Sequence, residues 1–234
     1  QKGHFRYWLQ GPIVTAVIIE DRTLTRIYDK DFGDGSKALH PIYEAWFYPQ
    51  NKKVELGYTM ENIWASSDPN KSMRDTSYGL TLMSGNVSPT VEFTHPTFNH
   101  IGSSRWHKTF WLGADPQTIR IDHNINYLVT TKAIPNYDTS VVPSESLLQS
   151  HYSSWVNAPK SFSGNGTYLG NYGYGLGTAG SNPWIGLMNT WDTLYLLTMD
   201  GRMLEKSLGN ADLAGRIPYN FREADTAAGS GDFF

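Results

Sequence analysis

The stretch KVELGYTM, residues 53–60, decides the fold class because its large apolar residues alternate with polar or small ones. The apolar positions are Val54, Leu56, Tyr58 and Met60. A period of two is typical of a β-strand, in which successive side chains point to opposite faces of a sheet. The run IYEAWFYP, residues 42–49, precedes it across residues 50–52, so the two runs predict a β-hairpin.

Runs of the same kind recur from His4 to about residue 131, with no helical period between them. They are RYWLQ (6–10), IVTAVIIE (13–20), TLTRIY (23–28), YGLTLMS (78–84), TVEFT (90–94), RWHKTFW (105–111), QTIRID (117–122) and INYLVTT (125–131). About ten strands in succession predict antiparallel sheets stacked face to face. We therefore expect a mainly β chain with an antiparallel, supersandwich-like β-sandwich domain over residues 1–142.

Beyond Pro135 the period changes to that of helices. Ser144 is a suitable N-cap. Leu148, Tyr152 and Trp155 follow it at helical spacing, which predicts a short amphipathic helix over residues 144–156. Residues 163–180 then contain seven glycines and predict an extended connection or binding loop. Residues 143–182 are thus expected to hold a short helix and a Gly-rich connection.

The last region, residues 183–234, is expected to be an αα-hairpin followed by a tail. Its apolar residues form two helical stripes, the first with Trp184, Met188, Trp191 and Tyr195 and the second with Leu204, Leu208 and Ala211. The pair Asp200-Gly201 separates the stripes. Such a hairpin leaves apolar surface exposed on an isolated chain, so we expect it to begin a larger helical domain.

The overall composition narrows the classes of partner. Aromatic residues make up 14% of the 234 residues and charged residues 18%, a balance typical of extracellular β-proteins and sugar-binding surfaces. The net charge of −3, without a run of Lys or Arg, argues against nucleic acid as a partner. No apolar run reaches the roughly 18 residues of a transmembrane helix, so no membrane span is expected.

No metal site and no cofactor are predicted. The absence of cysteine excludes disulfides, thiolate metal sites and a cysteine nucleophile. No pair of histidines has the spacing of a zinc site; the nearest approach is His95 and His100 in THPTFNH, which we expect to flank a turn. The acidic run DKDFGDG, residues 29–35, has Gly33 at a ligand position of a calcium loop and no closing glutamate, so a solvated turn is expected.

The run RWHKTFW concentrates the candidate binding residues. As a strand it would direct Trp106, Lys108 and Phe110 to one face, and Arg105, His107, Thr109 and Trp111 to the other. Arg105, His107 and Lys108 are candidates for neutralising an acidic sugar. Trp111 is the candidate stacking platform, and His123 in IDHNINY is a further candidate. The alternative is packing alone: the aromatic residues fill the core and its rim, and the Arg and Lys stems lie along the sheet edge.

Five strings carry a resemblance to known proteins. They are YWLQGPIVTAVIIEDRT, LHPIYEAWFYP, SSRWHKTFWLG, DHNINYLVTTKAIPNYDTS and GNADLAGRIP. Together they resemble large, mostly uncharacterised bacterial and phage-associated proteins in which a β-sandwich precedes an α/α toroid, an architecture similar to that of rhamnogalacturonan lyase-like proteins. The resemblance implies that residues 184–215 are the first hairpin of the toroid. It implies as well that further hairpins belong to the rest of a longer chain or to other subunits.

Three functions follow. The first is the β-sandwich portion of an extracellular carbohydrate-active protein that binds acidic glycan; if it is an enzyme, it is a polysaccharide lyase or is similar to a glycoside hydrolase, with catalytic residues that the sequence does not identify. The second is a structural component of a virion or extracellular assembly without catalytic activity. A glycan-binding module without catalysis needs only the stacking platform. Each places the chain outside the cell, at a cell surface or on a virion.

Overall fold

The computed structural model describes residues 4–20, 39–65, 72–112, 116, 121–158, 170–171, 188–219 and 221–223. Within this part of the chain, more residues lie in strands than in helices, and the larger sheets are antiparallel, so the prediction of a mainly β chain is confirmed. The chain forms two compact units: one contains all the described strands and the other contains all four described α-helices. The predicted boundaries at residues 142 and 182 do not coincide with these units.

The first unit is built on a five-stranded antiparallel sheet. Its strands are β1 (His4–Gln10), β2 (Thr15–Glu20), β3 (His40–Tyr48), β4 (Lys53–Asn62) and β8 (Ser104–Leu112), in the order β1-β2-β3-β4-β8. The predicted hairpin is confirmed: β3 and β4 pair from Tyr48↔Lys53 to His40↔Glu61. A short 3-10 turn, η1 (Pro49–Asn51), joins them, and Lys52 closes the turn with a φ of 50°.

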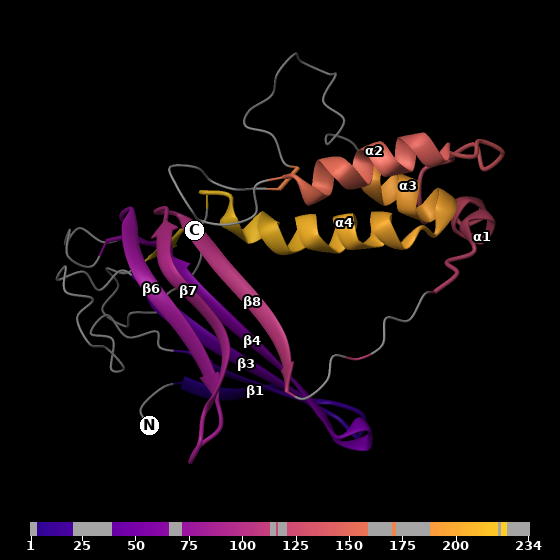
Figure 1. The fold of residues 1–234 in the computed structure, drawn as a ribbon. Coiled ribbons are helices and arrows are strands. Elements are labelled where there is room, and N and C mark those ends of the chain that lie inside the picture. Colours follow the sequence, from indigo (N-terminus) through magenta and orange to yellow (C-terminus); the bar gives the residue numbers. More distant parts are fainter. Residues whose placement is uncertain are drawn as a thin grey trace. The chain divides into compact units, whose positions relative to one another are not determined.

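Strands β6 (Thr76–Ser84) and β7 (Thr90–His100) form a two-stranded antiparallel ribbon and run side by side in Figure 1. The ribbon packs on one face of the five-stranded sheet, which we call the inner face. The core between them contains Leu39, Tyr58, Met60, Tyr78, Leu82, Phe98 and Trp106. Because Tyr58 and Met60 come from β4 and Trp106 comes from β8, the ribbon covers the β4–β8 half of the inner face.

A short parallel pair ties the C-terminal segment to this unit. β5 (Trp64–Ala65) pairs with β9 (Arg222–Glu223), and the backbone N–H of Arg222 donates to the carbonyl of Ile63 at 2.8 Å. The Arg222 guanidinium donates to both carboxylate oxygens of Glu61, at 2.9 and 3.1 Å. The segment is therefore held by both backbone pairing and a buried ion pair.

The second unit contains α1 (Ile125–Thr130), α2 (Glu145–Val156), α3 (Thr190–Thr198) and α4 (Gly201–Leu213). The predicted helix after Ser144 is confirmed, and the Ser144 hydroxyl accepts from the backbone N–H of Leu147, as an N-cap does. α4 packs against both α2 and α3. Figure 1 shows α2 and α4 running alongside each other. The core of the unit joins Leu148, Leu194 and Met203.

Three sequence predictions need correction. The strand predicted over residues 125–131 is wrong: α1 begins there because the Asn124 side chain accepts from the backbone N–H of Tyr127 and caps a helical turn. Ile121 and Asp122, the described end of the predicted strand 117–122, lie in no strand. His95 and His100 do not flank a turn: both lie within β7.

The buried stripe of α4 also differs from the prediction. It consists of Met203, Lys206, Asn210 and Leu213, whereas Leu208 is 59% exposed. Two polar residues belong to this buried stripe, and for that reason hydrophobicity alone selects the wrong face. The predicted strand 23–28, the acidic run 29–35, Trp184 and most of the Gly-rich segment lie outside the described residues.

Candidate functional site

The face of the five-stranded sheet opposite to the ribbon, which we call the outer face, carries most of the predicted site. Strand pairing aligns its side chains in four rows across β3, β4 and β8. The rows are Trp46–Glu55–Trp111, Glu44–Gly57–Thr109, Ile42–Thr59–His107 and His40–Glu61–Arg105. The predicted alternation of RWHKTFW is confirmed, because Trp106 and Phe110 pack into the core on the inner face.

At the centre of the outer face, a carboxylate and an imidazole flank a glycine. A Cβ atom at Gly57 would lie 3.4 Å from Cε1 of His107 and 3.6 Å from Oε2 of Glu44. The Thr59 hydroxyl lies 2.8 Å from Nδ1 of His107, a hydrogen bond that orients the ring. Glu44 and His107 are both half-buried. Because it has no side chain, Gly57 allows one acidic and one imidazole group to lie close to the sheet backbone on either side of it.

One end of the outer face is aromatic. The rings of Tyr48 and Trp111 lie 5.5 Å apart at an interplanar angle of 36°. The Tyr48 hydroxyl donates to Glu55 at 3.5 Å, and burial together with this carboxylate raises the pKa of Tyr48 above its usual range. Partly exposed aromatic rings beside a carboxylate are suited to binding sugar, because a ring face can stack on the sugar while the carboxylate accepts from its hydroxyl groups.

The other end of the outer face is ionic. The side chain of Glu61 is 2% exposed and pairs with both Arg105, at 3.2 Å, and Arg222, at 2.9 Å. Both guanidinium groups thus contact one buried carboxylate, and the Arg105 side chain is one-third exposed. Arg105 is therefore the cationic group at this end that an anionic group could reach.

The structure brings together Arg105, His107 and Trp111 but not the other two predicted residues. Lys108 points to the inner face, where its Nζ lies 5.3 Å from the centre of the Phe93 ring. His123 belongs to the helical unit, and its Nε2 lies 3.3 Å from the Tyr195 hydroxyl.

Sequence reasoning missed the acidic side of the site. Glu44, Trp46 and Tyr48 occur in IYEAWFYP, whose period of two by itself predicts only a strand. The two runs of the hairpin together contained a usable signal, because their register places Glu44 opposite Gly57 and Trp46 opposite Glu55. Taking both strands of the hairpin together identifies a polar face.

A second concave feature lies in the helical unit. A groove of about 1030 Å³ is lined by Trp155, by residues 198–202 and by the exposed side of α4, including Glu205, Leu208 and Asp212. Glu205 accepts from the Trp155 indole at 3.2 Å and from the Tyr152 hydroxyl at 3.1 Å. Both carboxylate oxygens are thus engaged by α2, which makes Glu205 a link between two helices.

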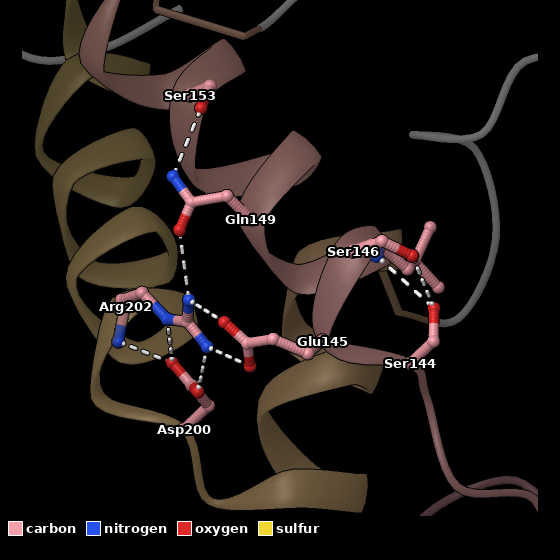
Figure 2. Close-up of polar contacts among 8 residues, drawn as sticks. Ser144, Glu145, Ser146, Gln149, Ser153, Asp200 and Arg202 are labelled. Carbon is pink, nitrogen blue, oxygen red and sulfur yellow. Dashed lines mark hydrogen bonds and ion pairs between the residues drawn. The ribbon is translucent and has the colours of Figure 1, made fainter.

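Beside this groove, Arg202 joins the start of α2 to the start of α4, as Figure 2 shows. Its guanidinium donates to Glu145 at 2.7 and 2.9 Å, to Asp200 at 2.8 Å and to Gln149 at 3.1 Å. Hydrogen bonds from Arg202 lower the pKa values of Glu145 and Asp200. This network has the arrangement of a helix-capping and cross-linking element.

Comparisons with protein-family models, curated proteins and solved structures give no match to this chain. Among the described residues, no helix is both long and apolar enough to span a membrane. Within the same residues, no group of three or more His, Asp or Glu side chains is arranged to hold a metal ion.

Proposed function

We propose that this chain is the β-sandwich portion of an extracellular carbohydrate-active protein and that the outer face binds an acidic glycan. The observation that carries this proposal is the set of four aligned rows, whose partly exposed side chains include aromatic, carboxylate, imidazole and guanidinium groups. In the same rows, His40, Ile42, Thr59 and Glu61 are buried. A sugar chain needs this combination, because its ring faces stack on aromatic side chains and its hydroxyl groups require hydrogen-bond partners.

The preference for an acidic sugar rests on the ionic end of the outer face. Arg105 pairs with Glu61 and is a partly accessible cation, with one-third of its side chain exposed. Along an acidic glycan bound over the rows, the carboxylate of one uronate would lie near Arg105. The ring of another sugar unit, further along the chain, would lie near Trp111, because these side chains are six positions apart on β8. Lys108 plays no part in this arrangement, because its ammonium group lies against Phe93 on the other face.

If the protein is an enzyme, we propose a polysaccharide lyase or a protein similar to a glycoside hydrolase. Glu44 and His107, at the sides of Gly57, are titratable groups of the kind that transfer protons in both reactions. The consecutive helices α3 and α4, separated by two residues, support an αα-hairpin that begins a toroid. The remaining hairpins would belong to the rest of a longer chain or to other subunits.

The binding proposal is tested by titrating the full chain with polygalacturonate and with an uncharged glucan, following tryptophan fluorescence and heat. We expect polygalacturonate to bind more tightly. Replacement of Trp111 by Ala should weaken binding about tenfold, the effect of losing roughly 1.4 kcal/mol of stacking. His107→Ala should also weaken it, and new unsaturated ends would identify a lyase.

The control is Thr94→Ala, because Thr94 is exposed but lies on β7, outside the five-stranded sheet. It should bind as the unaltered chain does. If neither polymer binds, or if Trp111→Ala and His107→Ala bind like the control, the outer face is not a glycan site.

A second candidate function is a structural component of a virion or extracellular assembly. It is favoured by the uncovered part of the inner face, where Phe5, Tyr7, Tyr43 and Phe47 are between 41% and 55% exposed. Contiguous exposed apolar patches on folded proteins mark interfaces with other macromolecules.

A further inference from the structure

The inner face of the five-stranded sheet is only partly covered by the β6–β7 ribbon. Strand register aligns Phe5, Ile19, Tyr43, Tyr58 and Lys108 in one row across all five strands. Tyr58, under the ribbon, is 4% exposed, whereas Phe5, at the far end of the row, is 55% exposed. The same row therefore passes from core to surface where the ribbon stops.

A groove of about 700 Å³ lies at this transition. Val17, Ile19 and Tyr43 line it from the five-stranded sheet, and Leu82 and Met83 line it from β6. Met83 is 53% exposed. The groove thus continues the apolar interface between the two sheets beyond its present edge.

β6 is the ribbon strand next to the groove, because Thr81, Leu82 and Met83 all contribute to its lining. In the part of the chain that the structure describes, residues 80–84 pair with β7 and with no other strand. The opposite edge of these residues consequently presents backbone N–H and C=O groups beside an apolar floor. An open strand edge of this kind is a template for pairing with another strand.

The occupant that fits both features is an extended strand. Neighbouring strands lie about 4.8 Å apart and stacked sheets about 10 Å apart, so one more strand beside β6 would lie over β2 and β3 as the ribbon lies over β4 and β8. Its backbone would pair with residues 80–84, and every second side chain would point into the groove. We infer that this groove accepts a β-strand of another polypeptide, with apolar residues at alternate positions, by strand addition to β6.

This inference rests on the second candidate function, assembly through the inner face, and names the kind of segment that such a partner would supply. It is independent of glycan binding, because the outer face lies on the opposite side of the sheet. A helix would fill the groove but leave the β6 edge unpaired, and for this reason we assign a strand.

The test uses the full chain and a synthetic peptide, KVTVTVTVK, whose valines alternate with threonines. A second peptide of the same composition, KVVVTTTVK, breaks the alternation and serves as the peptide control. Binding is followed by fluorescence anisotropy, and amide hydrogen exchange of residues 80–84 reports where the peptide sits. We expect the alternating peptide to bind at least tenfold more tightly and to slow exchange of these amides at least tenfold.

Two variants probe the groove from its two sides. Tyr43→Lys and Met83→Lys should each weaken peptide binding at least tenfold, whereas Thr109→Lys, on the outer face, should leave it unchanged. Met83 is exposed on the ribbon, so its replacement tests the groove even if Tyr43→Lys impairs folding. Absence of peptide binding, binding without protection of residues 80–84, or binding that both groove variants leave unaltered would overturn the inference.

The outcomes also separate this inference from the function on which it rests. If the chain binds the alternating peptide but forms no assembly, the strand-acceptor site is supported and the assembly function is excluded. If the chain assembles but does not bind the peptide, and Met83→Lys leaves assembly unchanged, assembly uses another surface and the strand-acceptor site is excluded.

Discussion

At the scale of single residues, Glu61 is the most constrained charge in the described part of the strand-containing unit. It lies in the last row of the outer face, is almost fully buried, and pairs with one arginine from β8 and one from β9. A buried carboxylate costs free energy to desolvate, and its partners are equally costly to leave without it. The ion pairs therefore hold β9 only while all three groups are present.

Replacing Glu61 by Gln should lower the free energy of unfolding by about 3 kcal/mol, because Arg222 would remain buried without a carboxylate. Urea denaturation followed by tryptophan fluorescence measures the change. Glu55→Gln is the matched control, with an expected loss below about 1 kcal/mol, since Glu55 is only half-buried. Equal losses in the two variants would contradict this account.

His100 is a second residue whose burial has a measurable consequence. It is fully buried, its Nδ1 lies 2.8 Å from the Tyr78 hydroxyl, and its Nε2 lies 3.0 Å from the Ser104 carbonyl. Burial lowers the pKa of His100 to about 4. The folded protein thus favours the neutral imidazole of His100, which lies between the Tyr78 hydroxyl and the Ser104 carbonyl.

Because the pKa in the folded state lies below the unfolded value of about 6.5, acid should destabilise the strand-containing unit. The stability that depends on a neutral His100 is fully present above about pH 6.5. Up to about 3 kcal/mol of it is lost as the pH falls toward 4. Unfolding free energies at neutral and mildly acidic pH measure the loss. A His100→Gln variant should lose less stability over the same interval; an identical pH dependence in both proteins would exclude His100 as the source.

At the scale of elements, the contact between α2 and α4 depends on one glycine. The Trp155 ring lies against Gly209, so that a Cβ atom there would overlap the indole. The same indole donates to Glu205 one turn earlier in α4. A glycine inside a helix is normally unfavourable by about 1 kcal/mol relative to alanine, and here it permits close packing of the two helices.

Gly209→Ala should therefore destabilise the helical unit by about 1–3 kcal/mol, despite the better helix propensity of alanine, because the added methyl group displaces Trp155. Thermal unfolding monitored by circular dichroism at the helical band measures the effect. Leu208→Ala, one position earlier but exposed, should change the stability by less than about 0.5 kcal/mol. A stabilised Gly209→Ala protein would show that propensity outweighs packing.

At the scale of the whole molecule, the uncovered inner face should govern association in solution. Large aromatic residues at this face lose contact with water only when another surface covers them. Under the second candidate function, we expect the 26.3 kDa chain to form larger species as its concentration rises. Replacing both Phe5 and Tyr43 by Ser should reduce this association, as measured by light scattering.

A chain that stays monomeric at every concentration would contradict self-assembly and favour the glycan-binding function. The matched control replaces Tyr219 and Val87, which are exposed outside the strands of the five-stranded sheet. If the control reduces association as much as the replacement of Phe5 and Tyr43 does, association reflects general surface hydrophobicity and not the inner face.

Local patterns in the sequence determined most of the described strands, the direction of their side chains and the helix that follows Ser144. These features depend on a period of two or on one capping side chain, both of which are properties of neighbouring residues. For the same reason, the alternation of RWHKTFW is sufficient to assign its two faces. The placement of Arg105, His107 and Trp111 on one face follows from this alternation alone.

Only the tertiary structure decided which strands are neighbours and which faces are covered. His107 meets Thr59 across 48 residues, and Glu44 joins them only because β8 pairs with β4 rather than with another strand. Local patterns also misassigned α1, where a capping asparagine outweighs strand propensity, and the buried face of α4, where Lys206 and Asn210 are buried. Strand order and burial are set by contacts between distant segments, and a local period contains no information about those contacts.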